Sequence, residues 1–272
     1  MATDLRSVHI RSTGLELHAL ERNPAGRPSV LFLHGWLDHG HGFDPLVDAL
    51  PGSWRTLALD FRGHGQSAHL REGLYHFPDY LADVEAAVAY LGPPVHLVGH
   101  SMGGAVSFMY AAARPDAVRS LTALENAGPI GSEGLGPIER LAAFVSDLGK
   151  PPRKRTYPTL DAAVARVREN NGSLSPEAAE LLTRFGTHPV PGGVQFTFDP
   201  ALRHHSAMVL REPQILELLR AVRCPVQLIQ GTDGLIVIDD DVKQRLAVLK
   251  NPPVHTVPGG HHVHLDRPAE VA

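Results

Sequence analysis

The residues with the clearest chemical potential lie at 98–104, where Ser101 stands between Gly99 and Gly103. An apolar, strand-like run enters this stretch and a helix-like run leaves it. A chain that turns abruptly from strand to helix pushes the corner residue toward positive φ and crowds the backbone, so only small flanking residues fit. The Ser101 hydroxyl then projects from the sheet edge, and the Met102 N–H points from a helix N-terminus at any oxyanion that forms. This spacing indicates either a nucleophilic serine or a glycine-rich turn without chemistry, and the rest of the chain has to decide.

The elements that must position Ser101 alternate between strand and helix patterns. Uninterrupted apolar runs predict strands buried on both faces, and apolar residues at helical spacing predict helices between them. The predicted elements of the first half are 29–33, 43–50, 56–59, 78–91, 95–98, 105–113 and 121–124. Residues 8–22 alternate around a Ser12-Thr13-Gly14 turn and predict an antiparallel hairpin at the start. This order is typical of right-handed βαβ units and a parallel sheet.

The alternation breaks after residue 126. Glycine and proline crowd residues 128–137, and further proline-rich stretches lie at 151–158 and 189–193. The predicted helices between them are 138–148, 161–170 and 176–185, the last with Ser175 as its N-cap. The alternation resumes with 215–222, 226–229, 239–249 and 254–257. We therefore expect an α/β core formed by residues 1–126 and 213–272, with an inserted helical cap at 127–212.

Composition narrows the class of protein. The chain has 272 residues, 43% hydrophobic and 20% charged, which is enough for one large domain with a substantial core. A net charge of −4 without a basic cluster argues against nucleic acid or anionic membranes as partners. The single cysteine, Cys224, excludes an internal disulfide and a thiolate metal cluster, and no signal-peptide-like start or membrane-length apolar run is apparent. We expect a cytoplasmic protein that acts on a small molecule; the oligomeric state is not indicated.

Four motifs, in their order and spacing, resemble those of the α/β-hydrolase superfamily. They are His34-Gly35-Trp36, residues 60–67, Gly99-His100-Ser101-Met102-Gly103-Gly104 and Gly260-His261. Residues 174–187 and 257–264 are similar to the group called serine hydrolase-like proteins. The resemblance covers nearly the whole chain and is thinnest over 127–173. It implies an α/β-hydrolase fold, in which a mostly parallel sheet is flanked by helices and carries an inserted helical cap, and it implies no metal or organic cofactor.

The same resemblance assigns roles to residues at the strand ends. It implies Ser101 as the nucleophile and His261, directly after a Gly-Gly turn, as the general base. The N–H groups of Trp36 and Met102 would form the oxyanion hole. His262 and His264 are expected to be neighbours of the base without a role in the chemistry.

The loop after the strand 29–33 contains further histidines. His34 is expected to brace this loop, and residues 60–67 are expected to form a turn that supports the site. His39 and His41 lie near Asp38 and could suggest metal ligation. Because glycines separate them and no other ligand set is apparent, we expect a mobile loop there and no metal site.

Two carboxylates are candidates for the acid that would orient His261. Many family members carry an aspartate three residues after the glycine that ends the strand following the cap, but here that position is Gly234, and Asp233 comes one residue early. Glu125 ends the strand 121–124, from which haloalkane dehalogenases and coelenterazine luciferases in this fold take their acid. A carboxylate there would accept the His261 ring N–H and stabilise the imidazolium. We favour Glu125 and keep Asp233 as the alternative.

The resemblance favours acyl transfer to water. A serine in place of an aspartate at position 101 argues against the alkyl-enzyme chemistry of related dehalogenases and epoxide hydrolases. We expect hydrolysis of a carboxylic ester or lactone through an acyl-enzyme. The alternatives are a carbon–carbon bond hydrolase, in which Arg140, Arg166 or Arg184 would stabilise an enolate, and a non-catalytic ligand-binding or sensor protein.

Aromatic residues of the predicted cap suggest where the acyl group would bind. Phe144, Phe185 and Phe196 are the candidate pocket residues, although at such spacings they could equally form the core of the cap. Residues 267–272 begin what in the family is a final helix.

Overall fold

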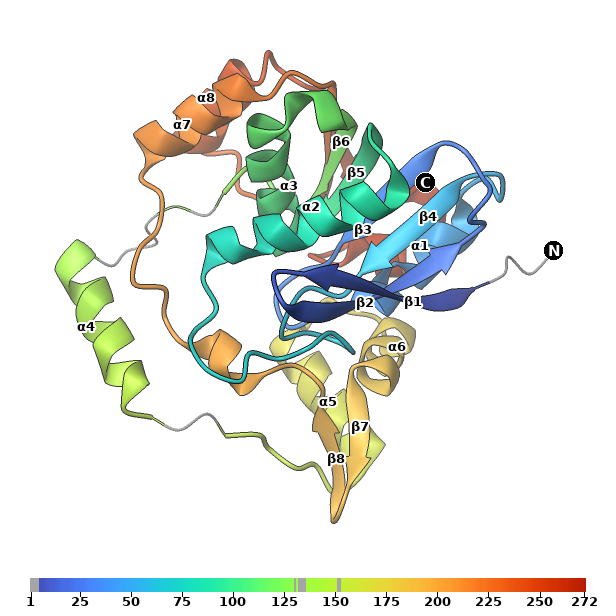
Figure 1. Cartoon of the computed structure of the whole chain (residues 1–272), viewed down its shortest axis with the longest axis vertical. Coiled ribbons are helices and arrows are strands. Elements are labelled where there is room, and N and C mark those ends of the chain that lie inside the picture. The colour runs from blue at the N-terminus through green and yellow to red at the C-terminus, as the bar shows by residue number, and fades with distance from the viewer. Residues whose placement is uncertain (1–4, 130, 132–135, 151–152) are drawn as a thin grey trace.

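The computed structural model describes residues 5–129, 131, 136–150 and 153–272; residues 1–4 and parts of the predicted glycine- and proline-rich stretches at 128–137 and 151–158 lie outside it. At its centre is an eight-stranded sheet (Figure 1). Across the sheet the strands are β1 (Arg6–Ser12), β2 (Leu15–Arg22), β4 (Arg55–Leu59), β3 (Ser29–Leu33), β5 (Val95–His100), β6 (Val118–Leu124), β9 (Val226–Gly231) and β10 (Val254–Val257). β1 pairs with β2 and β2 with β4 in antiparallel fashion, and the other neighbours are parallel. The predicted first hairpin and mostly parallel sheet are confirmed.

Helices cover both faces of this sheet. On one side lie α2 (Tyr80–Leu91), α3 (Met102–Ala113), α7 (Glu212–Ala221) and α8 (Asp240–Val248). On the other side lie α1 (Asp44–Ala49), α9 (Val263–Asp266) and α10 (Pro268–Val271). The shorter 3₁₀ turns are η1 (Gly40–Phe43), η2 (Phe77–Asp79), η3 (Pro115–Ala117) and η4 (Pro200–Arg203). None of the helices that the structure describes has the length and apolar character needed to cross a membrane.

The central strand β3 explains this layering. All five of its residues are buried, as its uninterrupted apolar sequence predicts for a strand covered on both faces. Leu31 and Leu33 join the apolar cluster under α2 and α3, whereas Val30 and Phe32 join the cluster under α1. The strand therefore fixes the position of the loop that follows it from both sides of the sheet.

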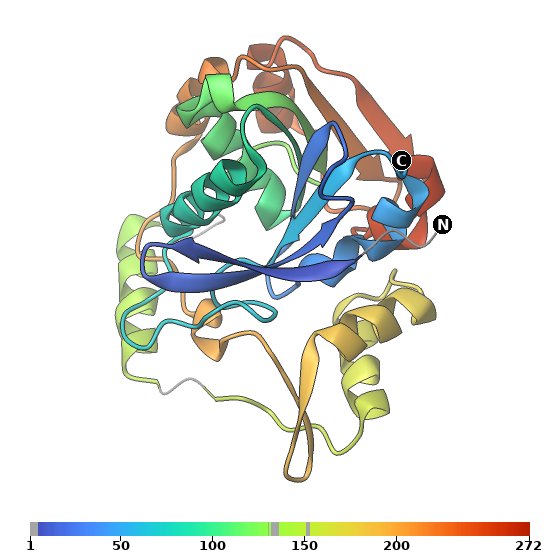
Figure 2. The same cartoon turned by 45° about the vertical axis from the view of Figure 1, so that its right-hand side comes forward.

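Between β6 and β9 the chain leaves the sheet. It forms α4 (Pro137–Leu148), α5 (Leu160–Asn170), α6 (Pro176–Phe185) and a hairpin of β7 (Thr187–Val190) and β8 (Gly193–Phe196). Figures 1 and 2 show α4 well apart from α5, α6 and the hairpin. The three helices were predicted, and Ser175 caps α6 by accepting a hydrogen bond from the Ala178 N–H at 3.2 Å. The division into a core and a cap stays a prediction.

The hairpin β7–β8 was not expected, because the whole insertion was interpreted as helical. Its register pairs Val190 with Gly193 across a two-residue turn, and Gly192 and Gly193 have φ of 87° and 141°. Glycine adopts such angles without steric cost. A Cβ on Gly193 would also lie 1.8 Å from the carbonyl oxygen of Tyr157, which pairs with Val194. The prolines around this turn concealed a strand pattern that is only four residues long on each side.

Candidate active site

Ser101 lies at the junction of β5 and α3. Its φ of 50° and ψ of −115° are strained for a residue with a side chain. The strain is held from both sides, because the Ser101 N–H donates to the Leu124 carbonyl at 2.9 Å and the Ser101 carbonyl accepts from the Ala105 N–H at 3.1 Å. Strained backbone conformations of this kind are common at active sites and ligand-binding sites. The corner predicted from the glycine spacing is present.

The two glycines that flank Ser101 are required by close backbone contacts. A Cβ on Gly99 would lie 2.5 Å from the Gly103 carbonyl oxygen. A Cβ on Gly103 would lie 1.9 Å from the carbonyl oxygen of Leu33, at the end of β3. Gly103 therefore allows the first turn of α3 to pack against the chain leaving β3, which brings the Trp36 loop toward the N-terminus of α3.

His261 and Glu125 come together from two strand ends. His261 lies in the turn between β10 and α9, and its Nδ1–H donates to Glu125 Oε2 at 3.1 Å. With the proton on Nδ1, the lone pair of His261 is on Nε2. The Glu125 side chain is fully buried, whereas that of His261 is 18% exposed. The imidazole can therefore reach solvent or substrate while its partner carboxylate cannot.

The Glu125 carboxylate is held by the backbone as well. Its Oε1 accepts from the Gly231 N–H at 2.6 Å and its Oε2 from the Leu235 N–H at 2.7 Å. Burial alone would raise the pKa of Glu125, but the hydrogen bonds from His261 and the two N–H groups outweigh it and hold the pKa below its usual value. Glu125 itself has a φ of 53°. A buried, ionised carboxylate thus faces the His261 ring.

Gly234 explains why the carboxylate fits. A Cβ at position 234 would lie 2.1 Å from Glu125 Oε1 and 2.4 Å from Oε2, so any larger residue would displace the carboxylate. Asp233, the alternative acid, is exposed and accepts a hydrogen bond from the Thr232 hydroxyl at 3.0 Å. The structure therefore brings Glu125 to His261 and leaves Asp233 on the surface.

The predicted oxyanion donors belong to facing segments. Met102 is the first residue of α3 and is buried, while Trp36 follows β3 with 53% of its surface exposed. The Trp36 indole N–H donates to the Leu202 carbonyl at 3.2 Å, so this side chain contacts η4. The N-terminus of α3 supplies N–H groups and a favourable dipole for negative charge.

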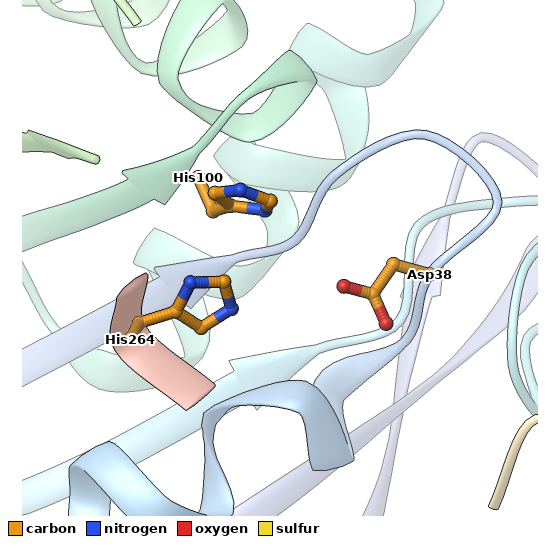
Figure 3. A group of neighbouring side chains, drawn as sticks. All are labelled: Asp38, His100 and His264. Atoms are coloured by element: carbon orange, nitrogen blue, oxygen red, sulfur yellow. The ribbon is translucent and has the colours of Figure 1, made fainter. Parts of the chain in front are cut away.

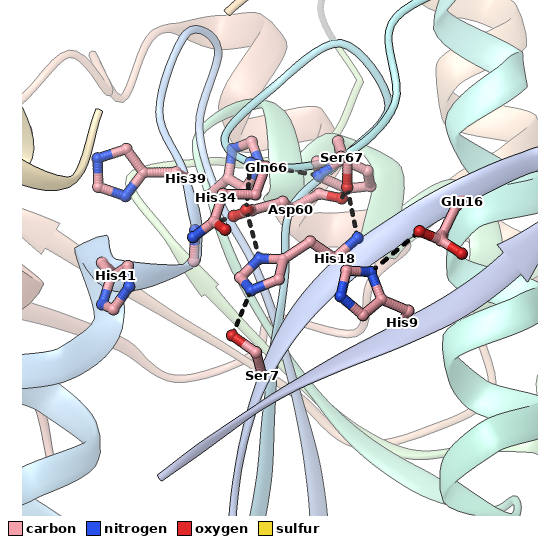
Figure 4. Close-up of polar contacts among 12 residues, drawn as sticks. Ser7, His9, Glu16, His18, His34, His39, His41, Asp60, Gln66 and Ser67 are labelled. Atoms are coloured by element: carbon pink, nitrogen blue, oxygen red, sulfur yellow. Dashed lines mark hydrogen bonds and ion pairs between the residues drawn. The ribbon is translucent and has the colours of Figure 1, made fainter. Parts of the chain in front are cut away.

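The loop after β3 is braced as expected. His34 Nδ1–H donates to the Gly35 carbonyl at 2.7 Å, and His34 Nε2 accepts from the Phe61 N–H at 3.0 Å. Asp60 accepts from the Gly40 N–H at 2.6 Å and from the Gln66 N–H at 2.9 Å (Figure 4). These bonds tie the loop to the turn at 60–67, whose supporting role was predicted.

The expectation of a mobile loop around His39 and His41 is not met. His39 Nε2–H donates to the Leu182 carbonyl of α6 at 2.9 Å. His41 Nδ1–H donates to Asp44 at 2.6 Å, and the His41 ring stacks on Phe185 with centroids 3.8 Å apart. The two histidines therefore fasten this loop to α6 and α1, a role that local sequence could not reveal because Leu182 and Phe185 are far along the chain.

A hydrogen-bonded chain of a serine, a histidine and an aspartate away from Ser101 was not predicted. His18 Nδ1 bonds to Asp60 Oδ2 at 2.8 Å, and His18 Nε2 bonds to the Ser7 hydroxyl at 2.9 Å (Figure 4). Burial opposes ionisation of Asp60, but the bond and charge of His18 hold its pKa well below the usual range. Ser7 lies within the β1–β2 ladder, whereas Ser101 adjoins a helix N-terminus. The Ser7–His18 bond joins β1 to β2. Ser7, which also lies beside a histidine, can be compared with Ser101 in its reactivity.

The candidate pocket residues are dispersed. Phe196 packs against Tyr157 and Phe198, with ring centroids 5.6 Å and 5.4 Å apart, and Phe185 stacks on His41. Phe144 is half-buried on α4. No ring contact among Phe144, Phe185 and Phe196 occurs in the described ranges, so a shared pocket stays a prediction.

The arginines considered for an enolate have other contacts. Arg166 pairs with Glu169 on α5, and Arg184 pairs with Glu180 on α6, all with exposed side chains. The Nε of Arg140 is buried and has no hydrogen-bond partner among the described residues. Arg166 and Arg184 are thus paired on the surface, and the carbon–carbon bond hydrolase stays an alternative.

Histidines gather behind the strand end that carries Ser101. The ring centroid of His100 lies 4.6 Å from that of His261 and 4.3 Å from that of His264. His100 Nε2–H donates to the His261 carbonyl at 2.9 Å, which ties the residue before Ser101 to the His261 turn. Burial lowers the pKa of His100 and of His264 well below the usual value, and it lowers that of His262 as well. His262 and His264 are neighbours of His261, as predicted, but the position of His100 was missed.

Comparisons with known proteins agree with this fold. Residues 30–272 match a family model described as "Alpha/beta hydrolase family". A serine hydrolase-like protein of Danio rerio is 34% identical over 261 residues, which cover 91% of this chain and 79% of that protein. A hypothetical protein of Pseudomonas aeruginosa PAO1 superposes with a TM-score of 0.87 at 35% identity, covering 97% of this chain and 94% of that one. The thioesterase domain from the curacin biosynthetic pathway superposes with a TM-score of 0.87 at 26% identity, covering 98% of each chain.

Proposed function

Because the chain belongs to the alpha/beta hydrolase family, we propose that it is a serine hydrolase that cleaves a carboxylic ester or lactone through an acyl-enzyme. The observation that carries the proposal is the hydrogen bond from His261 to the buried Glu125. The turn that contains His261 is also hydrogen-bonded to His100, the residue before the strained Ser101. An imidazole that a carboxylate orients is the group that can activate a serine hydroxyl within its reach.

In the proposed first step, the Ser101 hydroxyl oxygen attacks the carbonyl carbon of the substrate. His261 Nε2 accepts the hydroxyl proton, because Nδ1 is engaged with Glu125. The ionised Glu125 stabilises the resulting imidazolium and holds the ring in one tautomer. The tetrahedral intermediate then collapses, its bond to the leaving oxygen breaks, and that oxygen takes the proton from Nε2.

In the second step, water attacks the acyl carbon. His261 Nε2 takes a proton from this water and returns it to the Ser101 oxygen when the ester bond to the enzyme breaks. In both steps the carbonyl oxygen becomes an oxyanion, for which the Trp36 and Met102 N–H groups are the proposed donors. A single donor of this kind is worth about 10²- to 10³-fold in kcat in serine hydrolases.

Two similarities support acyl transfer as the reaction class. The relative from Danio rerio is named a serine hydrolase-like protein, and the curacin domain is named a thioesterase, a class of enzyme that hydrolyses an acyl bond. Neither name identifies the acyl group that this chain would accept. Two further expectations also stay predictions: that the protein lies in the cytoplasm, and that its partner is a small molecule and not a nucleic acid or a membrane.

The test is hydrolysis of p-nitrophenyl acyl esters of increasing chain length, measured beside a ring-cleavage dienoate. We expect turnover of at least one ester and none of the dienoate, and loss of turnover in the folded Ser101→Ala variant. Cleavage of the dienoate alone would favour the carbon–carbon bond hydrolase. Ester turnover that persists in Ser101→Ala would overturn the proposed nucleophile.

A further inference from the structure

Three buried side chains that the proposed reaction does not use meet beside Ser101. They are Asp38, His100 and His264, and Figure 3 shows the carboxylate and the two rings facing a common space. One nitrogen or oxygen atom from each lies within 4.8 Å of the others. Asp38 is 9% exposed, His100 is 1% exposed, and His264 is fully buried. A carboxylate and two imidazoles are thus gathered away from bulk water.

The atoms that face this space are unpaired. Within the described ranges, Asp38 Oδ2, His100 Nδ1 and both ring nitrogens of His264 have no hydrogen-bond partner. Buried polar atoms are almost always paired, because leaving one unpaired costs free energy. Each of the three neighbouring side chains therefore offers one such atom to a ligand that they share.

The remaining polar atoms orient two of the three side chains. Asp38 Oδ1 accepts from the His39 N–H at 2.8 Å, which leaves Oδ2 for the cluster. His100 Nε2 bonds to the His261 carbonyl at 2.9 Å, and since a carbonyl oxygen only accepts, the His100 proton is on Nε2. His100 Nδ1 therefore presents a lone pair to the cluster. A backbone bond that fixes the tautomer in this way is the usual support of a metal-binding histidine.

Two glycines leave room at the ligand atoms. A Cβ on Gly42 would lie 3.1 Å from Asp38 Oδ2, and a Cβ on Gly35 would lie 3.0 Å from His100 Nδ1. Both distances are shorter than ordinary van der Waals contact. Side chains at positions 35 and 42 would crowd the cluster, whereas glycines there leave space beside Asp38 Oδ2 and His100 Nδ1.

We propose that Asp38, His100 and His264 bind a divalent transition-metal ion, with zinc as the representative. Two imidazole nitrogens and one carboxylate oxygen are a ligand set that zinc and similar ions prefer. Zinc bonds to such atoms are about 2.0–2.2 Å long, so ligand atoms at tetrahedral angles lie about 3.3–3.6 Å apart. The ligand atoms, now within 4.8 Å of one another, would move together by up to about 1.5 Å on binding.

The proposed metal site adjoins the proposed catalytic residues. Asp38 is on the Trp36 loop, His100 precedes Ser101, and His264 follows His261 by three residues. A dication held by these segments would lie next to the His261 ring, because His100 contacts that ring.

Binding is tested without any reference to activity. The full-length protein, stripped of metal with a chelator, is titrated with zinc chloride in a calorimeter. The titration is repeated for Asp38→Asn, His264→Gln and the control His255→Gln, which alters an exposed histidine of β10. We expect one tight site in the unaltered protein and in His255→Gln, and at least tenfold weaker binding in the other two. Circular dichroism confirms that each variant is folded.

A spectroscopic measurement covers the case in which the buried variants fail to fold. X-ray absorption of the zinc-loaded, unaltered protein is expected to show two histidine nitrogens and a carboxylate oxygen around the metal. Zinc affinity that is unchanged in folded Asp38→Asn and His264→Gln, or a spectrum without two histidine ligands, would mean adventitious surface binding only and would overturn the site.

Discussion

At the scale of single residues, Glu125 is the choice on which the proposed triad depends. The sequence suggested Glu125 because Gly234 occupies the position at which many family members carry an aspartate. The structure shows why a glycine at 234 and a glutamate at 125 occur together. The space that a side chain at position 234 would fill is taken by the Glu125 carboxylate. The contact between Glu125 and His261 could therefore be anticipated, although the catalytic roles stay predictions.

Replacing Glu125 with glutamine tests its role in catalysis. We expect Glu125→Gln to lower kcat/KM roughly 10³- to 10⁴-fold, because a neutral amide does not stabilise the His261 imidazolium and favours the wrong tautomer. Asp233→Asn is the matched control and should change kcat/KM less than about threefold, since Asp233 is exposed. A fully active Glu125→Gln variant together with an inactive Asp233→Asn variant would exchange the two assignments.

The pKa of Glu125 also predicts how its stabilising effect depends on pH. Its folded-state pKa lies below the value of about 4.3 for an unfolded glutamate. The ionised form therefore stabilises the fold fully above that pH, and the effect is lost as the pH falls toward the folded-state pKa. We expect Glu125→Gln to cost about 1–3 kcal/mol in urea unfolding at pH 7, and less below about pH 4. A difference that does not shrink in acid would mean that the charge is not the cause.

Gly234→Ala should impair the same pair from the opposite side. The added methyl would lie 2.1 Å from Glu125 Oε1 and must displace the carboxylate from His261. We expect a fall in kcat/KM of about 10²-fold or more, with KM changed little, because geometry at the reacting groups is what is lost. Gly172→Ala is the control, since a Cβ there would meet no atom within 4 Å and Gly172 does not have a positive φ. Unchanged kinetics in Gly234→Ala would show that the carboxylate position is unimportant.

At the scale of elements, most strands and helices could be predicted because their apolar patterns are complete in the sequence. Where prediction failed, the cause is visible. α3 begins at Met102 and not at 105, since Gly103 and Gly104 in its first turn concealed the helix. The hairpin β7–β8 has four residues in each strand, too few for a clear alternation. Contacts between distant segments, such as His39 with Leu182, leave no local pattern at all.

The attachment of α4 is a prediction at this scale. Asp147, near its end, accepts from the His205 N–H at 2.9 Å and from His205 Nδ1–H at 2.7 Å. These bonds hold the pKa of Asp147 well below its usual range, so the carboxylate is ionised at neutral pH. We expect Asp147→Asn to speed hydrogen exchange in α4 at neutral pH, while exchange in α2 is unchanged. Equal exchange in α4 of both proteins would show that this contact does not hold the helix.

At the scale of the whole molecule, a buried ion pair joins α2 to the turn after β4 and also binds the first hairpin. Asp83 of α2 accepts from the Arg62 guanidinium at 2.7 Å and from the Ser12 hydroxyl at 3.1 Å. The Asp83 side chain is fully buried and that of Arg62 is 7% exposed. Removing one partner would leave an uncompensated buried charge, which is strongly destabilising.

We therefore expect Asp83→Ala to lower the free energy of unfolding by about 3–5 kcal/mol in urea titrations. Asp240→Asn, which alters an exposed pair with Lys243, should cost about 0–1 kcal/mol. A cost below about 1 kcal/mol for Asp83→Ala would mean that the pair contributes little to the stability of the molecule.

The whole arrangement converges on Ser101, so the most direct test is covalent labelling of the folded protein with a fluorophosphonate. The proposed site predicts one adduct per chain, located on Ser101 by peptide mass spectrometry. The adduct should be absent in Ser101→Ala and after unfolding in urea, and it should form more slowly in Glu125→Gln. No adduct on Ser101 in the folded protein, or an adduct on Ser7 in its place, would contradict the assignment of Ser101 as the nucleophile.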